Sequence, residues 1–281
     1  MELKPIYTIQ EQIDKLRNRG CLIEDEAYCV MFLRNVNYYR LTAYFLPFRN
    51  DDHNYKEGTT FRQVKRIYDF DQKLRALIFA AIEEVEISIR TRLAYYHAHT
   101  YGAHGYWQAG NFNQSHKHEL FISQIEQEID RNKNALFVKH HQMKYGGKYP
   151  IWVIIELFSL GMLSRFYADM LLKDRKQIAL QFNTKDQYLV SWLRSMTVLR
   201  NTCAHCERLY YSMFTNLPKI PPRLRLQQTR MLFDQILTIK LLSRYPDKWN
   251  TTHLANLSNL LKEYADSIEY KHIGFMDGRT F

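Results

Sequence analysis

The chain is poor in the two residues that most often interrupt helices and form tight turns. It contains 10 Gly and 7 Pro among 281 residues, below the usual ~7% and ~5%. A β protein needs many tight turns built from these residues. The scarcity therefore predicts an all-α protein.

The longest helical pattern runs from Thr60 almost to Thr100. Apolar residues recur there at intervals of three and four, which is typical of a helix with one buried face. They are Phe61, Val64, Ile67, Leu74, Leu77, Ile78, Ala81, Val85, Ile89 and Leu93. A straight helix of this length would span roughly 58 Å. That is more than a compact domain of this size needs, so we expect a bend near Asp69 to Asp71.

Three shorter helices are predicted before this pattern. The first follows a capping box, Thr8-Ile9-Gln10-Glu11, and stops at Gly20. The second begins at Asp25, and the third begins near Asn37 and stops at Pro47. These helices form an N-terminal extension of the main bundle.

Beyond the long helix, the stretch from Tyr101 to Ser115 predicts a long loop because it is rich in Gly, Asn and Gln. Further helices are predicted at residues 116–131, 151–158, 162–182, 186–210, 223–245 and 252–270. We divide the chain into an N-terminal helical segment, 1–58, and a helical domain, 59–281. No GxxxxGK or GxGxxG motif is present, and the sequence indicates no cofactor.

Charge and composition narrow the class of protein. Lys and Arg exceed Asp and Glu by 39 to 29, a net charge of +10 that favours a polyanionic partner. The apolar stretch Ile151 to Leu163 is shorter than the ~18 residues of a membrane span and contains Glu156. The N-terminus resembles neither a signal peptide nor a lipid anchor, and four cysteines are too few for a disulfide framework. We expect a cytoplasmic protein with reduced thiols and no membrane partner.

Polar and reactive side chains are concentrated in Leu199 to Tyr210, which continues an apolar stripe. The stripe is built by Leu189, Trp192, Leu193, Met196 and Leu199. On an α-helix Asn201, His205 and Arg208 would share one face, while Arg200 would lie ~140° from His205. Arg200 must then reach around the helix, or the helix must distort.

Arg200, Asn201 and His205 suit the cleavage of a phosphodiester. A guanidinium binds phosphate and stabilises the charge that develops during attack, and an imidazole transfers protons near neutral pH. RNA supplies its own nucleophile, the 2′-OH, so no metal ligand is needed. A general base and a general acid together require two imidazoles, and a homodimer would supply them as two copies of His205.

The bare RxxxxH spacing carries little information. About 0.8 occurrences are expected by chance at this composition, and a second one exists at Arg92 and His97. We interpret the second as a coincidence on a helix surface.

Structural explanations compete with each functional one. Arg200, Asn201 and His205 could form a buried polar network that fixes helix packing. Cys203 and Cys206 invite a zinc interpretation, which we disfavour because no second ligand pair follows; their role stays open. Three other polar clusters also have structural explanations. We interpret His97, His99, His104, His116 and His118 as solvated surface and the tyrosine-rich segment 37–44 as packing, although either could contact a ligand. Glu86 and Arg90 are expected to form an ion pair, with the alternative that Glu86 orients Arg200.

Residues along most of the chain resemble those of the Abi-like family of bacterial abortive-infection proteins, which belongs to the HEPN superfamily of α-helical nucleases. The resemblance is carried by Lys4-Pro5 with Gln12, Leu16 and Gly20, by Asn37-Tyr38-Tyr39-Arg40-Leu41 with Tyr44, by Tyr68-Asp69-Phe70-Asp71 with Leu74-Arg75, by Ile82-Glu83 with Glu86-Ile87 and Arg90-Thr91, and by Leu199-Arg200-Asn201-Thr202-Cys203-Ala204-His205 with Arg208-Leu209-Tyr210.

The resemblance implies a HEPN-type bundle and metal-independent cleavage of RNA in a dimer, as a phage-defence protein or a restrained toxin. Arg200, Asn201 and His205 match the ribonuclease motif of that superfamily, and Glu86, Arg90, Arg208 and Tyr210 are candidates for supporting the site or contacting RNA. We therefore expect an endoribonuclease, with RNA as substrate and an antitoxin protein or small RNA as a possible restraint. The alternatives are an RNA-binding regulator without catalysis and a purely structural interaction module.

Overall fold

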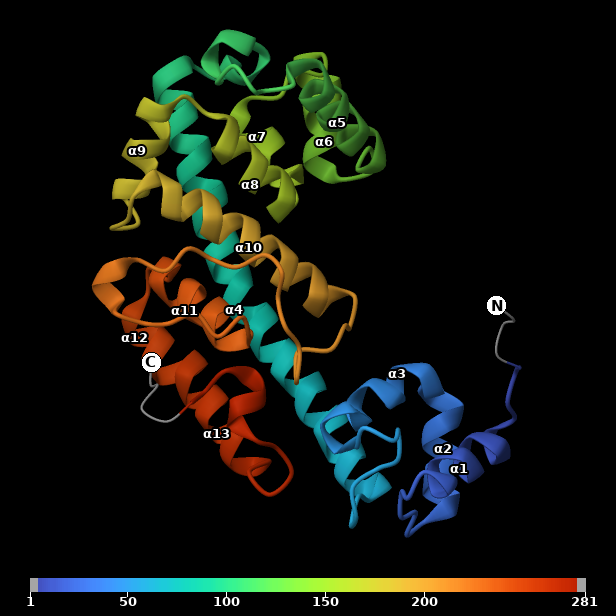
Figure 1. Ribbon diagram of the computed structural model, residues 1–281. Coiled ribbons are helices and arrows are strands. Elements are labelled where there is room, and N and C mark those ends of the chain that lie inside the picture. Colours follow the sequence, from blue (N-terminus) through green and yellow to red (C-terminus); the bar gives the residue numbers. More distant parts are fainter. Residues whose placement is uncertain (1–4, 277–281) are drawn as a thin grey trace.

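The computed structural model describes residues 5–276, and over this range the protein is all-helical (Figure 1). The extended pairings in this range are isolated bridges such as Leu22 with Thr60. The all-α prediction is therefore confirmed. None of the helices described is long and apolar enough to cross a membrane.

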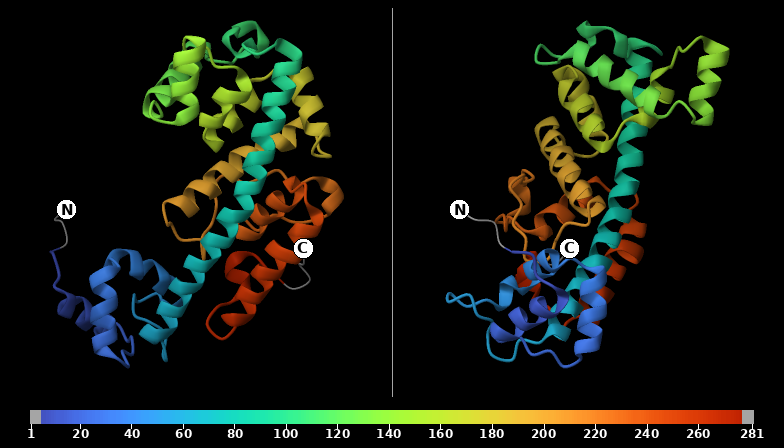
Figure 2. Two further views of the ribbon diagram at one scale, coloured as in Figure 1. Left: turned by 180° about the vertical axis from the view of Figure 1, so that it is seen from behind. Right: turned by 90° about the vertical axis from the view of Figure 1, so that its right-hand side faces the viewer.

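Helix α4, Phe61–Tyr101, is the axis of the molecule and is continuous for 41 residues. Its first N–H groups are capped by Thr60, whose side chain accepts a hydrogen bond from the Gln63 backbone at 3.0 Å. The bend expected near Asp69 to Asp71 is absent. The expectation assumed that the helix lies within one compact globule, whereas α4 carries a different group of helices at each end and in its middle (Figure 2).

The predicted N-terminal helices are confirmed and lie at the start of α4 (Figure 1). They are α1, Ile9–Asn18, with the capping box of Thr8 and Glu11; α2, Glu26–Asn35, capped by Asp25; and α3, Tyr38–Thr42, which continues as a 3₁₀ turn, Ala43–Phe48. Aromatic rings join this group to α4, and Phe32 packs edge-on against Phe61 and Tyr68. The domain boundary between residues 58 and 59 stays a prediction.

The far end of α4 carries the predicted loop and five helices. The loop holds two short 3₁₀ turns, Gly105–Trp107 and Ala109–Asn111, and the helices are α5, His118–Arg131; α6, Leu136–Tyr145; α7, Ile151–Ile154, with a 3₁₀ turn, Ile155–Leu157; α8, Leu160–Asp169; and α9, Leu172–Leu180.

Two features at this end differ from the prediction. Helix α6 was not predicted, because Leu136 and Met143 are exposed and the helix presents no regular apolar stripe. The helix expected over 162–182 is broken after Asp169. There the loop residue Asn113 donates hydrogen bonds to two carbonyls at the end of α8, from its side-chain amide to Ala168 at 3.0 Å and from its backbone N–H to Asp169 at 2.7 Å.

The middle of α4 packs against α10, α11 and α13. The elements of this region are α10, Asp186–Ala204; a 3₁₀ turn, Pro222–Leu224; α11, Leu232–Leu242; α12, Pro246–Lys248; a π-helical turn, Trp249–Leu254; α13, Ala255–Glu263; and a 3₁₀ turn, Tyr270–Ile273. The helices predicted over 186–210, 223–245 and 252–270 are thus present but shorter. Helix α11 begins late because the Asp234 carboxylate accepts the N–H groups of Thr229 and Arg230, both at 2.8 Å.

Candidate active site

The apolar stripe predicted for α10 is confirmed and fixes the orientation of this helix. Leu189, Trp192, Leu193, Met196 and Leu199 are each at most 1% exposed. They pack the helix against α4, α8, α9 and α11. The polar residues that follow the stripe therefore lie where the helix leaves the core.

Helix α10 ends at Ala204, immediately before His205. Cys206 adopts a left-handed φ of 56°. Its N–H donates to the carbonyl of Cys203 at 3.1 Å, and the following N–H donates to that of Thr202 at 2.9 Å. These two bonds form a Schellman motif, in which glycine usually occupies the left-handed position. The predicted continuation of the helix is wrong because this turn redirects the chain.

The helix end exposes two of the three predicted catalytic residues. Asn201 and His205 are exposed, and Arg200 is half-buried with its guanidinium carbon 5.8 Å from the centre of the Phe79 ring. Arg200 Nη1 lies 3.4 Å from Asn201 Oδ1. Within residues 5–276, the imidazole of His205 has no hydrogen-bond partner on either of these side chains. Arg200 therefore contacts its neighbour Asn201 and does not reach around the helix to His205, whose imidazole is exposed.

A buried carboxylate anchors the chain that follows His205. Asp71 of α4 is fully buried and accepts hydrogen bonds from the backbone N–H groups of Leu209 at 3.1 Å and Tyr210 at 2.7 Å. Its other oxygen accepts from Tyr44 Oη at 2.7 Å and Arg75 Nη1 at 2.5 Å. Burial raises the pKa of this carboxyl, whereas Arg75 and the hydrogen-bond donors oppose the rise. Asp71 thus takes over the role that helical carbonyls would have had beyond Ala204.

Guanidinium groups surround the segment from 200 to 208. Arg40 of α3 is exposed and donates to the Cys206 carbonyl. Arg75 donates to the carbonyl of Glu207 at 3.2 Å. Arg75 is paired with Asp71, whereas Arg40, Arg200 and Arg208 form no ion pair within residues 5–276. The surroundings of His205 are therefore cationic and suit a phosphate backbone.

Arg40, Asp71 and Arg75 were not singled out as site residues from the sequence, although all three stand among the residues that carry the family resemblance, and Asp71 and Arg75 also have a local signal. Asp71 and Arg75 are charged residues four positions apart within the apolar face of α4. A charged pair in such a face predicts a buried network. Arg40 carries no comparable signal, because only the tertiary structure brings α3 beside Cys206.

Two of the suggested supporting residues have other partners. Arg208 does not share a face with His205, because the helix has ended before it, and its Nη1 donates to the Ala43 carbonyl at 2.8 Å. Burial lowers the pKa of Arg208. Tyr210 is buried, and its hydroxyl lies 2.8 Å from His272 Nδ1. Tyr210 is therefore inaccessible to RNA and acts in packing.

Glu86 and Arg90 form the ion pair expected from their spacing, with Arg90 Nη2 2.9 Å from Glu86 Oε1. The same nitrogen donates to the Phe158 carbonyl at 3.0 Å and so ties α4 to the turn before α8. Glu86 makes no hydrogen bond to Arg200 in the part of the chain described. The pair is therefore placed for a structural role.

The cysteines beside the motif differ in environment. Cys203 is buried, which raises the pKa of its thiol to about 12, whereas Cys206 is exposed. All four cysteines are free thiols. Among residues 5–276 no three His, Cys, Asp or Glu side chains are gathered in a way that could hold a metal ion.

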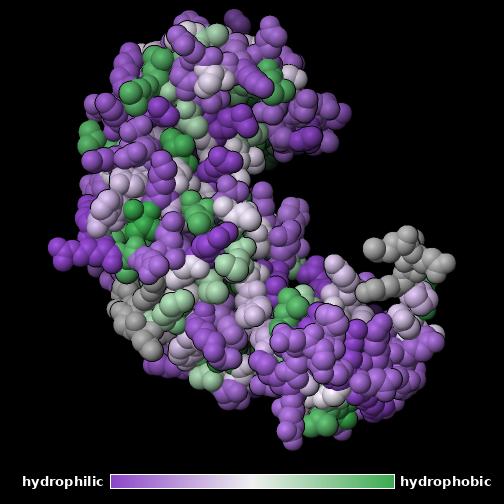
Figure 3. All heavy atoms as spheres, in the orientation of Figure 1, coloured by the Kyte–Doolittle hydropathy of each residue, from purple (hydrophilic) through white to green (hydrophobic). Residues whose placement is uncertain are grey.

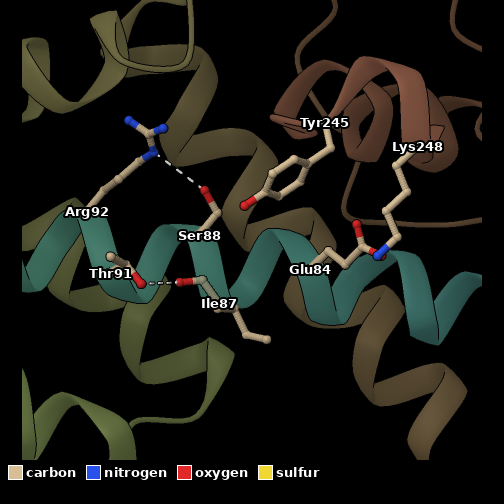
Figure 4. Close-up of a pocket in the computed structure, with 7 residues that line it drawn as sticks. All are labelled: Glu84, Ile87, Ser88, Thr91, Arg92, Tyr245 and Lys248. Atoms are coloured by element: carbon tan, nitrogen blue, oxygen red, sulfur yellow. Dashed lines mark hydrogen bonds and ion pairs between the residues drawn. The ribbon is translucent and has the colours of Figure 1, made fainter.

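The second RxxxxH spacing does not form a second site. Arg92 lines a cavity of about 490 Å³ between α4 and the segment that carries Tyr245 and Lys248 (Figure 4), and its Nε lies 3.4 Å from Ser88 Oγ. His97 lies on a different side of α4 and is fully buried. The two residues are thus separated by the helix.

The interpretation of the histidine-rich region as solvated surface is wrong for His97 and His116. The His97 ring packs against Tyr101, Phe112 and Phe166. His116 stacks on Phe112, and its Nδ1 lies 2.9 Å from Asp169 Oδ2. The aromatic rings of the loop and α8 create an apolar environment that the sequence spacing did not reveal.

Burial makes His97 a source of acid sensitivity. Neither ring nitrogen has a hydrogen-bond partner of good geometry within residues 5–276, and burial, only partly opposed by the nearby Gly105 backbone, lowers the pKa of His97 to about 4 from 6.5. Below pH 6.5 the unfolded chain binds a proton here that the folded chain does not, so stability is complete above pH 6.5 and is lost toward pH 4. We expect the free energy of unfolding to fall by up to about 3 kcal/mol over this window. Urea titrations at pH 7.5 and 4.5 should show a smaller fall for His97→Phe than for the wild type or for His99→Phe, which changes an exposed ring.

The C-terminal end of α10 faces a hollow on one side of the molecule, between the N-terminal helices and the helices at the far end of α4 (Figure 3).

A family model described as Abi-like protein matches residues 31–211, which is more than half of the chain. The matched range includes α3, the anchoring residues of α4 and the segment around His205. In comparisons with curated proteins and with solved structures, nothing matches the chain.

Proposed function

The chain belongs to the Abi-like protein family, and from this membership and the geometry around His205 we propose that it is a HEPN-type endoribonuclease. It would act in phage defence by abortive infection, or as a toxin held in check by an antitoxin. The observation that carries the proposal is the combination of an exposed imidazole with the guanidinium groups of Arg40 and Arg200 at the end of α10. A site built only for packing would not leave Asn201 and His205 in solvent.

The reaction uses the 2′-OH of RNA as nucleophile. One imidazole takes the 2′-OH proton as the 2′-oxygen forms a bond to the adjacent phosphorus, and a second donates a proton to the departing 5′-oxygen. The products carry a 2′,3′-cyclic phosphate and a 5′-OH. Arg200 binds the phosphate and stabilises its developing charge, and Asn201 orients the phosphate or the imidazole.

Each chain contributes one His205, so the complete site requires a homodimer. Phe79, which lies under the Arg200 guanidinium, is 37% exposed, and Met213 beyond the motif is 63% exposed. Exposed apolar side chains beside a catalytic motif favour coverage by a second protein surface. A second copy would bring its own imidazole and guanidinium to the same phosphate.

The test is an RNA oligonucleotide incubated with the protein in the presence of a chelator. We expect products that end in a 2′,3′-cyclic phosphate, and no cleavage when a single 2′-deoxynucleotide replaces the residue before the cut, because the nucleophile is then missing. Mass spectrometry of the products identifies the ends. Cleavage of the deoxy-substituted strand, or of DNA, would refute the mechanism. RNA binding without any cleavage would favour a regulator.

A further inference from the structure

A second candidate site lies in the N-terminal helices. The structure has a pocket of about 490 Å³ there, which lies within the ~300 to 1,000 Å³ typical of small-ligand sites. It is lined by Pro5, Tyr7, Lys15, Arg19, Tyr38, Tyr39, Thr42, Ala43, Phe45, Leu46, Arg49 and Tyr55. Among the residues that the structure describes, the lining thus contains four tyrosines and three cationic side chains but no carboxylate.

The cationic side chains of this tyrosine pocket are not neutralised. Lys15, Arg19 and Arg49 form no ion pair with a carboxylate in the described range of the chain. Lys15 Nζ instead lies 4.2 Å from the centre of the Tyr7 ring, and Arg49 Nη2 lies 3.4 Å from His53 Nδ1. Such a concentration of one charge favours an anionic ligand.

The tyrosines of the pocket offer flat ring surfaces. Tyr39 is 86% exposed, although packing was the expected role of its segment, and packing does hold for the buried Tyr44. The Tyr38 ring also lines the pocket, but its hydroxyl is buried, with no hydrogen-bond partner within residues 5–276, and is not open to a ligand. A ligand with a stackable ring would use the exposed face of Tyr39. A nucleotide combines such a ring with the negative charge.

The pocket and the candidate active site are joined by α3. Tyr38, Tyr39, Thr42 and Ala43 line the pocket. On another side of the same short helix, Arg40 donates to the Cys206 carbonyl, next to His205. The Ala43 carbonyl also accepts from Arg208, at 2.8 Å. One nucleic-acid strand could therefore contact both the tyrosine pocket and the segment around His205.

We propose that the tyrosine pocket binds one nucleotide of the RNA strand that is cleaved at His205. Tyr39 stacks on the base, and Lys15 and Arg49 bind phosphates on either side of it. The identity of the ligand as substrate rests on the proposed ribonuclease activity, but the binding itself does not. The pocket would set how far from a preferred nucleotide the strand is cut.

The test measures equilibrium binding of a fluorescent single-stranded RNA to the His205→Ala protein, in which cleavage does not interfere. We expect Tyr39→Ala to weaken binding about tenfold or more, since loss of base stacking on an aromatic ring has this size. Tyr95→Ala is the matched control, because Tyr95 is also an exposed tyrosine but lies near the other end of α4. It should leave the affinity unchanged.

Salt dependence tests the charges separately. Lys15→Gln and Arg49→Gln should each reduce the slope of log K against log salt by about 0.7, the value for one phosphate contact on a single strand. Arg34→Gln, which alters an exposed arginine of α2, should not. Equal affinities for Tyr39→Ala and Tyr95→Ala, with unchanged slopes, would overturn the inference. So would Tyr39-dependent binding of adenosine monophosphate without binding of RNA, since the pocket would then serve a free nucleotide. Failure of wild-type cleavage alone would refute the ribonuclease and leave the binding result standing.

Discussion

Replacing His205 with alanine is expected to lower the rate of RNA cleavage about 10²- to 10⁴-fold, the usual contribution of a proton-transfer group. The imidazole is exposed and has no hydrogen-bond partner among residues 5–276, so the free energy of unfolding should change by less than about 0.5 kcal/mol. Single-turnover cleavage and thermal unfolding measure the two effects on the same protein. RNA affinity should also be retained, and the toxicity of the expressed protein in cells should disappear.

A site composed of residues from two chains also predicts the activity of dimers that mix wild-type and His205→Ala chains. When wild-type and His205→Ala chains are mixed in equal amounts and allowed to exchange, random pairing leaves about one quarter of the dimers with two imidazoles. Activity should therefore fall to about one quarter of the value for wild type alone at the same total concentration. Activity that falls only to one half would mean that each protomer cleaves independently. Cleavage that persists in a folded His205→Ala protein would remove His205 from the mechanism.

Asp71→Asn should be the most destabilising change near the site. The amide cannot form the ion pair with Arg75 and turns an N–H₂ group toward atoms that are themselves donors. Breaking a buried pair by removing one partner costs about 3–5 kcal/mol, because the remaining charge stays buried without compensation. The one amide oxygen that remains can accept either from the Leu209 and Tyr210 N–H groups or from Tyr44 and Arg75, but not from both sets. We expect a lower free energy of unfolding in urea and, at temperatures where the variant is folded, a lower kcat with little change in KM.

Two further variants distinguish the loss of the Asp71 interactions from the loss of a negative charge as the cause of the lower stability. Asp69→Asn removes a carboxylate two residues earlier, which pairs with Lys65 at 2.5 Å near the surface. Such a pair is worth about 0 to 1 kcal/mol. The double variant Asp71→Asn, Arg75→Gln should recover part of the stability, because no unpaired charge remains buried. Equal losses for Asp69→Asn and Asp71→Asn would contradict the role of Asp71 as the anchor.

The starts of α1 and α2 and the buried face of α10 could be predicted from residues that lie close together in the chain. The capping box at Thr8 and the N-cap at Asp25 begin α1 and α2 as predicted, because each cap acts within one turn of the chain. The apolar stripe of α10 is buried as predicted, because its spacing matches the helical period. The breaks after Asp169 and Ala204 were missed. Both depend on hydrogen bonds with residues distant in the chain, Asn113 in the first case and Asp71 in the second.

The sequence by itself determined that the protein is helical, which face of α10 is buried, and that Arg200, Asn201 and His205 follow this face closely along the chain. These follow from periodicity and from neighbours within a few residues. Only the tertiary structure decided what surrounds them. Arg40 reaches Cys206 across 166 positions of the chain, and Asp71 reaches Tyr210 across 139. The energy of such contacts resides in the desolvation and pairing of buried charges, which depends on the completed fold and leaves no regular spacing in the sequence.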